Sequence, residues 1–205
     1  MTIYLLTRLL LFTAQAVALI TALKYWSYYK KTPQRLFLWF LVYVLLTEIL
    51  GLLLSHDNIP VYNLFTIVSG YTYLYWFYLT IRSQKLVLIL MSVFTLSIGY
   101  SLFFLTFNGE LWIEALMVIS TSLLICCLLY YYQLLNSVKV VHYQKLQPFW
   151  VSTGILVFYL GFLPLIVFQS YFIEVIPGEY QIAITILNIA LYGLIAYSFL
   201  CIKKR

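Results

Sequence analysis

Seven long apolar segments alternate with short polar ones along the 205 residues of the chain. A helix that crosses a bilayer needs about 20 predominantly apolar residues, and each segment reaches that length. The connections between the segments contain the clustered charges and most of the prolines, which interrupt helices. The predicted helices cover residues 4–24, 36–55, 61–81, 86–106, 111–135, 149–172 and 180–202. The pattern therefore predicts an all-α polytopic membrane protein, a single seven-helix transmembrane bundle over residues 1–205.

The composition supports this class and excludes an ordinary soluble domain. Hydrophobic residues make up 64% of the chain, charged residues only 9%, and the mean hydropathy is +0.99. Soluble domains contain about 25% charged residues, so this chain lies far outside their range. We expect an integral membrane protein with membrane lipid as its surroundings.

Charge segregation predicts the orientation, because Lys and Arg are retained on the cytoplasmic side of short connections. The cations follow the first, third, fifth and seventh segments: Lys24, Lys30, Lys31, Arg35, Arg82, Lys85, Lys139, Lys145, Lys203, Lys204 and Arg205. The opposite connections carry acidic residues: Asp57, Glu110, Glu174 and Glu179. Only Arg8 departs from this segregation. The N-terminus is therefore expected outside and the C-terminus in the cytoplasm.

The net charge of +6 does not indicate nucleic-acid binding, because the cations are divided among four connections and form no compact basic stripe. The topology signal explains most of them. The segment YYKKTPQR, residues 28–35, leaves open a further role in attracting anionic lipid or an acidic partner.

Glu48 interrupts the apolar segment LVYVLLTEILGLLL, residues 41–54. An ionisable side chain inside a bilayer costs about 2.5–3.5 kcal/mol on insertion scales, so it is expected to face the bundle interior or water. By its distance from the start of its helix, Glu48 lies in the outer half of the membrane. Arg8 and Gln15 lie at similar heights on the first helix, and Arg8 is a candidate counter-charge to Glu48 or Glu114.

Other polar side chains gather in the same outer half. On the third helix Asn63, Thr66, Gly70 and Tyr73 recur at helical spacing, and the seventh helix repeats this with Gln181, Thr185, Asn188 and Tyr192. The inner halves, such as SLLICCLL and LIAYSFL, are nearly apolar. The predicted ligand-binding residues are Glu48, Arg8, Gln15, Asn63, Thr66, Tyr73, Glu114, Gln181 and Asn188.

This asymmetry predicts a polar cavity that opens to the outside and is closed toward the cytoplasm, with Glu48, Asn63 and Asn188 facing one another. The alternative interpretation is that the polar residues only form hydrogen bonds between helices, which Asn, Gln, Ser and Thr commonly do in membranes.

The sequence offers little for catalysis. It contains no HExxH, GxSxG or glycine-rich phosphate loop, and we expect no metal and no cofactor. The last helix has no lysine before Lys203, which argues against a retinal photoreceptor. His56 and Asp57 are adjacent in the second connection, where a solvated loop pair is the favoured interpretation. Cys126, Cys127 and Cys201 are expected to be packing residues.

Two related pairs of segments indicate an internal repeat. KTPQRLF follows the first helix and KLQPFW the fifth, while NIPVYN precedes the third and VIPGEYQ the seventh. The proline–glutamine pair resembles the PQ-loop family, which includes SWEET-like transporters of small sugars. That resemblance implies helices 1–3 and 5–7 as parallel repeats. TPQRLFLWFLVYVLLTEILG, together with the following helix, is similar to small bacterial seven-helix membrane proteins, which implies a bacterial inner membrane.

The sequence thus favours a receptor-like or sensor-like protein that binds a small or lipidic ligand from the outside. Because its cytoplasmic connections are short, such a sensor would need a separate cytoplasmic signalling partner. A SWEET-like transporter or facilitator, an intramembrane enzyme using Glu48 with His56 or Glu114, and a structural subunit of a membrane complex remain as alternatives, although a non-enzymatic role is favoured.

Overall fold

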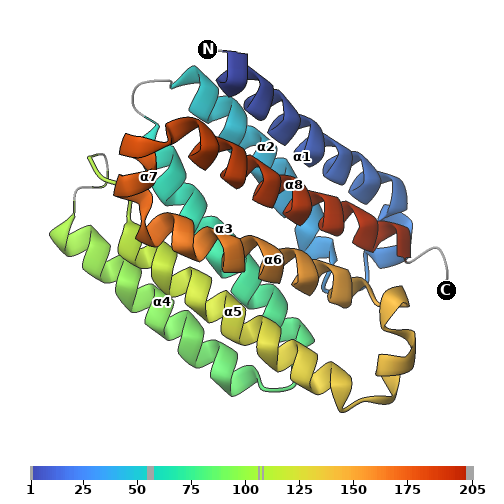
Figure 1. Cartoon of the computed structure of the whole chain (residues 1–205). Coiled ribbons are helices and arrows are strands. Elements are labelled where there is room, and N and C mark those ends of the chain that lie inside the picture. Colours follow the sequence, from blue (N-terminus) through green and yellow to red (C-terminus); the bar gives the residue numbers. More distant parts are fainter. Residues whose placement is uncertain (1, 55–57, 106, 108, 202–205) are drawn as a thin grey trace.

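The computed structural model describes residues 2–54, 58–105, 107 and 109–201, and these residues form helices joined by short connections, with no strand among them (Figure 1). The all-α prediction is confirmed for this part of the chain. The helices are α1 (Thr2–Tyr29), α2 (Arg35–Leu53), α3 (Ile59–Thr80), α4 (Gln84–Phe104), α5 (Ile113–Leu135), the 3₁₀ helix η1 (Val138–Lys145), α6 (Gln147–Val167), α7 (Gln169–Val175) and α8 (Pro177–Cys201).

Six of these helices are long and apolar enough to cross a membrane. They are α1 from Leu5 onward, α2, α4, α5, α6 and α8. Their outward faces expose leucine, isoleucine and phenylalanine side chains, which suits contact with lipid. The protein is therefore an integral membrane protein. α3 has 22 residues but falls outside this set, because tyrosines and small polar residues lower its hydropathy.

The helices pack in a closed ring. α1 contacts α2 and α8, α8 contacts α6, α6 contacts α5, and α3 contacts both α5 and α2, while α4 lies against α3 and α5. The two termini lie at opposite ends of the bundle (Figure 1). We call the end that holds the N-terminus, the α2–α3 and α4–α5 connections and α7 the N-terminal end. The other, with η1 and the α1–α2 and α3–α4 connections, is the C-terminal end.

The unusual composition of α3 follows from its position inside the bundle. Among its residues only Leu64, Tyr75 and Leu79 are exposed, and its polar side chains are covered by neighbouring helices. Gly70 allows the close approach of α4, because a Cβ atom there would lie 2.6 Å from the ring of Phe94. α3 can therefore be less apolar than its neighbours without presenting polar groups to lipid.

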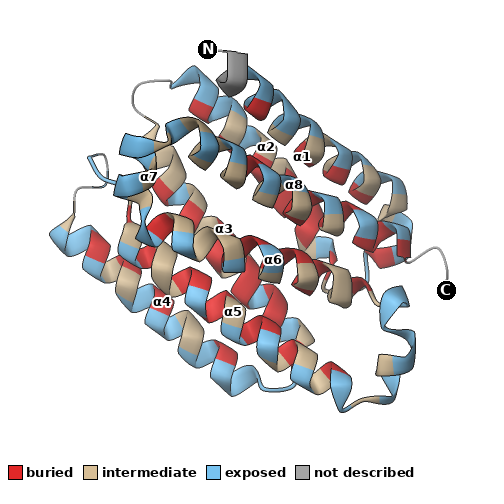
Figure 2. Cartoon of the chain, viewed as in Figure 1, coloured by how far each residue is buried: buried red, intermediate tan, exposed pale blue. Residues whose placement is uncertain are grey.

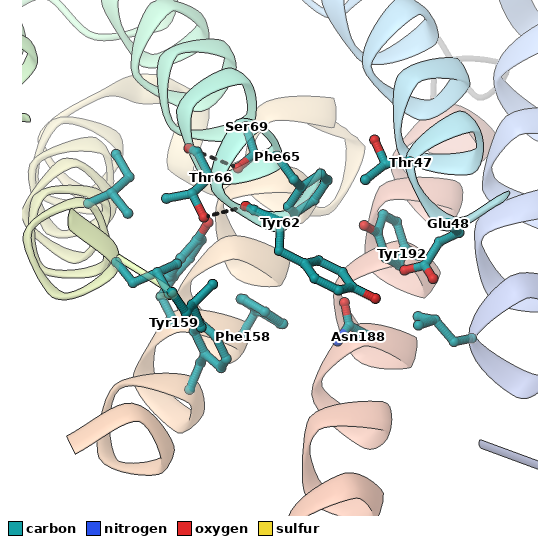
Figure 3. A pocket seen from close by; sticks show the side chains of 15 residues that line it. Thr47, Glu48, Tyr62, Phe65, Thr66, Ser69, Phe158, Tyr159, Asn188 and Tyr192 are labelled. Carbon is teal, nitrogen blue, oxygen red and sulfur yellow. Dashed lines mark hydrogen bonds between the residues drawn. The ribbon is translucent and has the colours of Figure 1, made fainter. Parts of the chain in front are cut away.

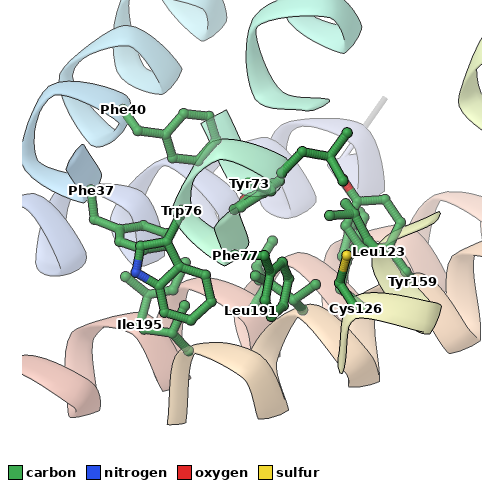
Figure 4. Close-up of a cluster of buried hydrophobic side chains, with 14 of the residues drawn as sticks. Phe37, Phe40, Tyr73, Trp76, Phe77, Leu123, Cys126, Tyr159, Leu191 and Ile195 are labelled. Carbon is green, nitrogen blue, oxygen red and sulfur yellow. The ribbon is translucent and has the colours of Figure 1, made fainter. Parts of the chain in front are cut away.

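Buried aromatic side chains fill the C-terminal half of the bundle. Phe37, Trp76 and Phe77 are fully buried, and the Phe37 and Trp76 rings meet edge to face with centroids 5.4 Å apart (Figure 4). Figure 2 shows the buried residues on the inward faces, while the outward faces of α1 and α4 are largely exposed. This cluster, which we call the aromatic core, occupies the interior of the half that the sequence predicts to be apolar.

Three segments differ from the predicted boundaries. α1 continues to Tyr29, five residues beyond its predicted end, because Tyr29 is buried against Phe199 and its hydroxyl donates to Ala22 O at 2.8 Å. The sixth predicted helix is divided at Phe168 into α6 and the short α7, one turn after Pro164. The longest predicted connection contains η1. The other boundaries agree within three residues.

Candidate ligand-binding site

A cavity of about 240 Å³ lies at the N-terminal end, between α1, α2, α3, α5, α6 and α8 (Figure 3). It is where the sequence predicts a cavity, although its walls are more aromatic than expected. We call it the upper cavity. Its lining consists of Leu11, Thr47, Glu48, Tyr62, Phe65, Thr66, Ser69, Leu111, Leu116, Ile119, Phe158, Tyr159, Phe162, Asn188 and Tyr192.

Glu48 is the carboxylate of the upper cavity. It lies five residues before the end of α2, which is about 8 Å along the helix. Its side chain is half-buried, and Gln15 Nε2 of α1 donates to its Oε1 across 3.5 Å. Arg8 is exposed and lies on α1 two turns before Gln15, near enough for its charge to act on Glu48. Gln15 therefore contacts Glu48 directly, whereas the pairing of Arg8 with Glu48 stays a prediction.

Gln15 has an unused acceptor beside this carboxylate. Its side chain is 1% exposed, and its Oε1 accepts no hydrogen bond of regular geometry among the described residues, although the Gln15 and Tyr192 side chains lie within hydrogen-bonding reach of each other. A buried acceptor without a partner costs about 1–3 kcal/mol.

Two tyrosines face Glu48 from other helices. Figure 3 shows Tyr62 of α3 with its hydroxyl directed toward Glu48, and the ring of Tyr192 of α8 beside the same carboxylate. Both tyrosines line the upper cavity together with Glu48. Gly51 makes room for Tyr62, because a Cβ atom there would lie 3.3 Å from the Tyr62 hydroxyl. The carboxylate therefore lies beside phenol groups from two other helices.

The aliphatic hydroxyls of the cavity use their protons within their own helices. Thr47 donates to Tyr43 O at 2.9 Å, Thr66 to Tyr62 O at 3.0 Å, and Ser69 to Thr66 O at 3.3 Å. A hydroxyl has one proton and two acceptor lone pairs, so each of these groups offers only an acceptor to a ligand. Together with Glu48, they make the cavity rich in hydrogen-bond acceptors.

Aromatic rings, together with Leu11, Leu111, Leu116 and Ile119, form the remaining walls of the cavity. Phe158 and Phe162 of α6 lie in contact with ring centroids 5.0 Å apart, and Phe158 meets Tyr159 edge to face at 5.0 Å. Tyr159 in turn meets Tyr73 of the aromatic core at 6.3 Å. The rings of Tyr159 and Tyr73 therefore mark the boundary between the upper cavity and the filled half of the bundle.

Asn63 is buried as expected, but its role differs from the predicted one. Its Nδ2 donates to Phe107 O at 3.0 Å and Glu110 O at 2.9 Å, and its Oδ1 accepts from Trp112 N at 3.1 Å. The side chain thus holds the α4–α5 connection and does not line the cavity. The prediction that Asn63 faces Glu48 and Asn188 is wrong for Asn63, whereas Glu48 and Asn188 do share the cavity.

The cavity lining also leaves out five other predicted residues: Arg8, Gln15, Tyr73, Glu114 and Gln181. Tyr73 is packed in the aromatic core against Phe40 at 5.0 Å. Glu114 is exposed in the first turn of α5, so it cannot act with Glu48 inside the cavity. Gln181 is half-buried near the start of α8, one and two turns before Thr185 and Asn188.

Thr66 and Asn188 line the cavity as predicted, and the Asn188 amide donates to Ile184 O at 2.9 Å. The residues that the prediction omitted are mainly aromatic. Tyr62, Thr66 and Ser69 recur at helical spacing i, i+4 and i+7, but this spacing alone does not separate their side of α3 from that of Asn63 and Gly70.

The described residues contain no group of three or more His, Cys, Asp or Glu side chains that could hold a metal ion. His56 and Asp57 lie outside the described residues. Cys126 and Cys127 are buried, and Cys127 Sγ donates to Ser152 O at 3.5 Å. Comparisons of the chain with protein families, curated proteins and solved structures give no match.

Proposed function

We propose that this protein is a receptor-like membrane protein that binds a small amphipathic amine in the upper cavity. The supporting observation is the contrast between the lining groups: Glu48 and the hydroxyl oxygens of Thr47, Thr66 and Ser69 can accept hydrogen bonds, while the other walls are aromatic and aliphatic. An ammonium group has three donors and no acceptor, and it is attracted to both a carboxylate and aromatic faces. The apolar part of such a ligand would lie against Phe158 and Phe162.

The size of the cavity supports a small ligand. Its volume of about 240 Å³ is below the range of about 300–1,000 Å³ that is typical of sites for drug-sized molecules. Arg8 is exposed and is not part of the cavity lining. Arg8 would therefore stabilise the carboxylate without a ligand, and an ammonium group would bind from the cavity side.

The purified protein in detergent tests this proposal by thermal unfolding with 2-phenylethylamine and 2-phenylethanol, which share their shape and differ in charge. The amine should raise the unfolding midpoint more than the alcohol, because a ligand that binds only the folded state stabilises it. Glu48→Gln should abolish the difference between the two ligands. Equal midpoint shifts by amine and alcohol in the unmodified protein would contradict the proposal.

Glu114→Gln provides the matched control, since Glu114 lies at the same end of the bundle but is exposed and outside the cavity. This variant should keep the full preference for the amine. Circular dichroism of both variants tests whether they retain the helical fold. Loss of the preference in Glu114→Gln would assign it to general surface charge and not to the cavity.

The proposal includes seven membrane crossings, with α3 as the seventh, and an N-terminus outside a bacterial inner membrane. The described cations other than Arg8 belong to segments at the C-terminal end, which supports this orientation. The upper cavity would then open to the outside. A receptor-like role would also need a cytoplasmic signalling partner, because the segments at the C-terminal end are short.

A transporter is the second candidate, and the contact pattern favours it over an enzyme. The contacts of α1 with α2 and of α2 with α3 recur as contacts of α5 with α6 and of α6 with α8, and the contact of α3 with α5 matches that of α8 with α1. This pattern suits the parallel repeats of SWEET-like transporters. Uptake of radiolabelled amine or sugar into proteoliposomes would support transport, and binding without uptake would support the receptor.

A further inference from the structure

A cleft of about 260 Å³ lies at the C-terminal end, far along the bundle from the upper cavity. It is formed by the α1–α2 connection, η1 and the start of α6. Both proline–glutamine pairs of the sequence line this cleft: Pro33-Gln34, and Gln147-Pro148, in which the two residue types follow in the reverse order. Lys139 and Lys145 of η1 complete its polar lining. We call it the basic cleft.

Positive charge in the basic cleft has no acidic counterpart among the described lining residues. A neighbouring hollow of about 200 Å³ shares Lys139 and adds Arg82, also without a described carboxylate. The described acidic residues belong to the N-terminal half of the bundle, on the later part of α2 and near the α4–α5 and α6–α8 connections. The cleft therefore concentrates cations in a recess, where they attract an anion more strongly than on an open surface.

Gln147 is a second and independent sign of a missing ligand. Its side chain is only 6% exposed, and its Nε2 has no hydrogen-bond partner among the described residues. An unpaired buried donor costs about 1–3 kcal/mol, and a phosphate oxygen is an acceptor that would remove this cost. The basic cleft thus combines two ammonium groups with an unused amide donor.

The surroundings of the cleft favour a lipid over a soluble anion. η1 exposes Val138 and Val141, at 91% and 72%, beside the outward-facing Leu135 of α5. Exposed valines next to lysines suit the boundary of a bilayer, where acyl chains lie beside charged headgroups. We propose that the basic cleft binds the phosphate group of an anionic phospholipid, with its acyl chains along η1 and α5.

Native mass spectrometry of the protein from nanodiscs tests this inference with phosphatidylglycerol as the probe and phosphatidylcholine as the neutral reference. The unmodified protein should retain phosphatidylglycerol preferentially. Lys139→Gln combined with Lys145→Gln should weaken that retention by roughly tenfold or more. Lys24→Gln combined with Lys85→Gln removes the same charge from exposed lysines outside the cleft and should change it little.

Gln147→Leu separates the donor from general electrostatics. Because it removes the unpaired amide at similar volume, it should raise stability in lipid-free detergent and still weaken phosphatidylglycerol retention. Equal losses in the two double-lysine variants would overturn the proposal, since the whole surface would then attract the lipid. Stabilisation by inorganic phosphate equal to that by phosphatidylglycerol, and equally dependent on Lys139 and Lys145, would assign the cleft to a soluble anion instead.

Discussion

The N-terminal and C-terminal halves of this bundle are built from the same helices but are packed differently. α3 contributes Thr66 and Ser69 to a cavity in one half, and Trp76 and Phe77 to a fully buried core in the other. Lipid tails are as apolar as leucine, so helices in a membrane associate through close packing and hydrogen bonds. The N-terminal half can therefore contain a ligand-sized cavity, because the close packing of the C-terminal half holds the helices together.

The two halves are also stabilised by different interactions. Edge-to-face ring contacts, such as that of Trp76 with Phe77 at 4.8 Å, dominate the C-terminal half. The N-terminal half depends on hydrogen bonds, above all those between Asn63 and the α4–α5 connection. Substitutions that are matched in type but placed in the two halves should therefore have unequal effects.

The largest difference is expected for truncation of phenylalanine. Phe77→Ala should destabilise the protein by about 3–5 kcal/mol, because it empties a fully buried site in the aromatic core. Phe65→Ala should cost less than half as much, since Phe65 already borders the upper cavity. Unfolding of both variants by denaturant titration in detergent measures the two losses. Equal losses would mean that the two halves are packed alike.

The next difference concerns two asparagines. Asn63→Leu should destabilise the protein by about 2 kcal/mol, because it leaves the buried backbone N–H of Trp112 without its acceptor. This variant should keep the preference for the amine over the alcohol. Asn188→Leu should have the opposite profile, with a loss below about 1 kcal/mol and weaker amine binding. The same thermal unfolding series with 2-phenylethylamine measures both properties. Loss of amine binding in Asn63→Leu alone would reverse these assigned roles.

The smallest difference is expected for overfilling. Leu116 lines the cavity and Leu123 is fully buried in the core, two turns later on the same face of α5. Leu123→Trp should destabilise by about 1–2 kcal/mol through overpacking, whereas Leu116→Trp should stay within about 1 kcal/mol of the unmodified protein and block the amine. A larger stability loss in Leu116→Trp would show that the upper cavity does not provide this space.

The sequence predicted the helical membrane fold and the central carboxylate, because the physical penalties involved are large. An ionisable side chain such as Glu48 is costly where it faces lipid, so it was expected to lie inside the bundle near other polar groups. Gln15 contacts it, and Arg8 is near it on the same helix as Gln15. The helix boundaries at the ends of α1 and α6 were less predictable. Tyr29 extends α1 through contacts with Phe199, which is far away in the sequence.

The cavity-facing side of α3 could not be derived from spacing alone. At 100° per residue, Asn63 and Gly70 are turned about 80° from the mean direction of Tyr62, Thr66 and Ser69. Because nearly the whole circumference of α3 is covered, both directions carry polar residues, and the pattern does not distinguish them. Tyr73 points in the cavity direction but lies one turn deeper than Ser69, within the core.

Thiol labelling of Ser69→Cys tests most directly whether the N-terminal half is hollow and open to the outside while the C-terminal half is filled. The background would have its three native cysteines replaced by alanine, and Ser198→Cys, at a fully buried position near the C-terminal end, would be the control. A small membrane-impermeant thiosulfonate added to intact cells should label Ser69→Cys, with protection by 2-phenylethylamine, and should leave Ser198→Cys unlabelled. Labelling of Ser69→Cys only in inside-out vesicles, or on neither side, would contradict an upper cavity that opens to the outside.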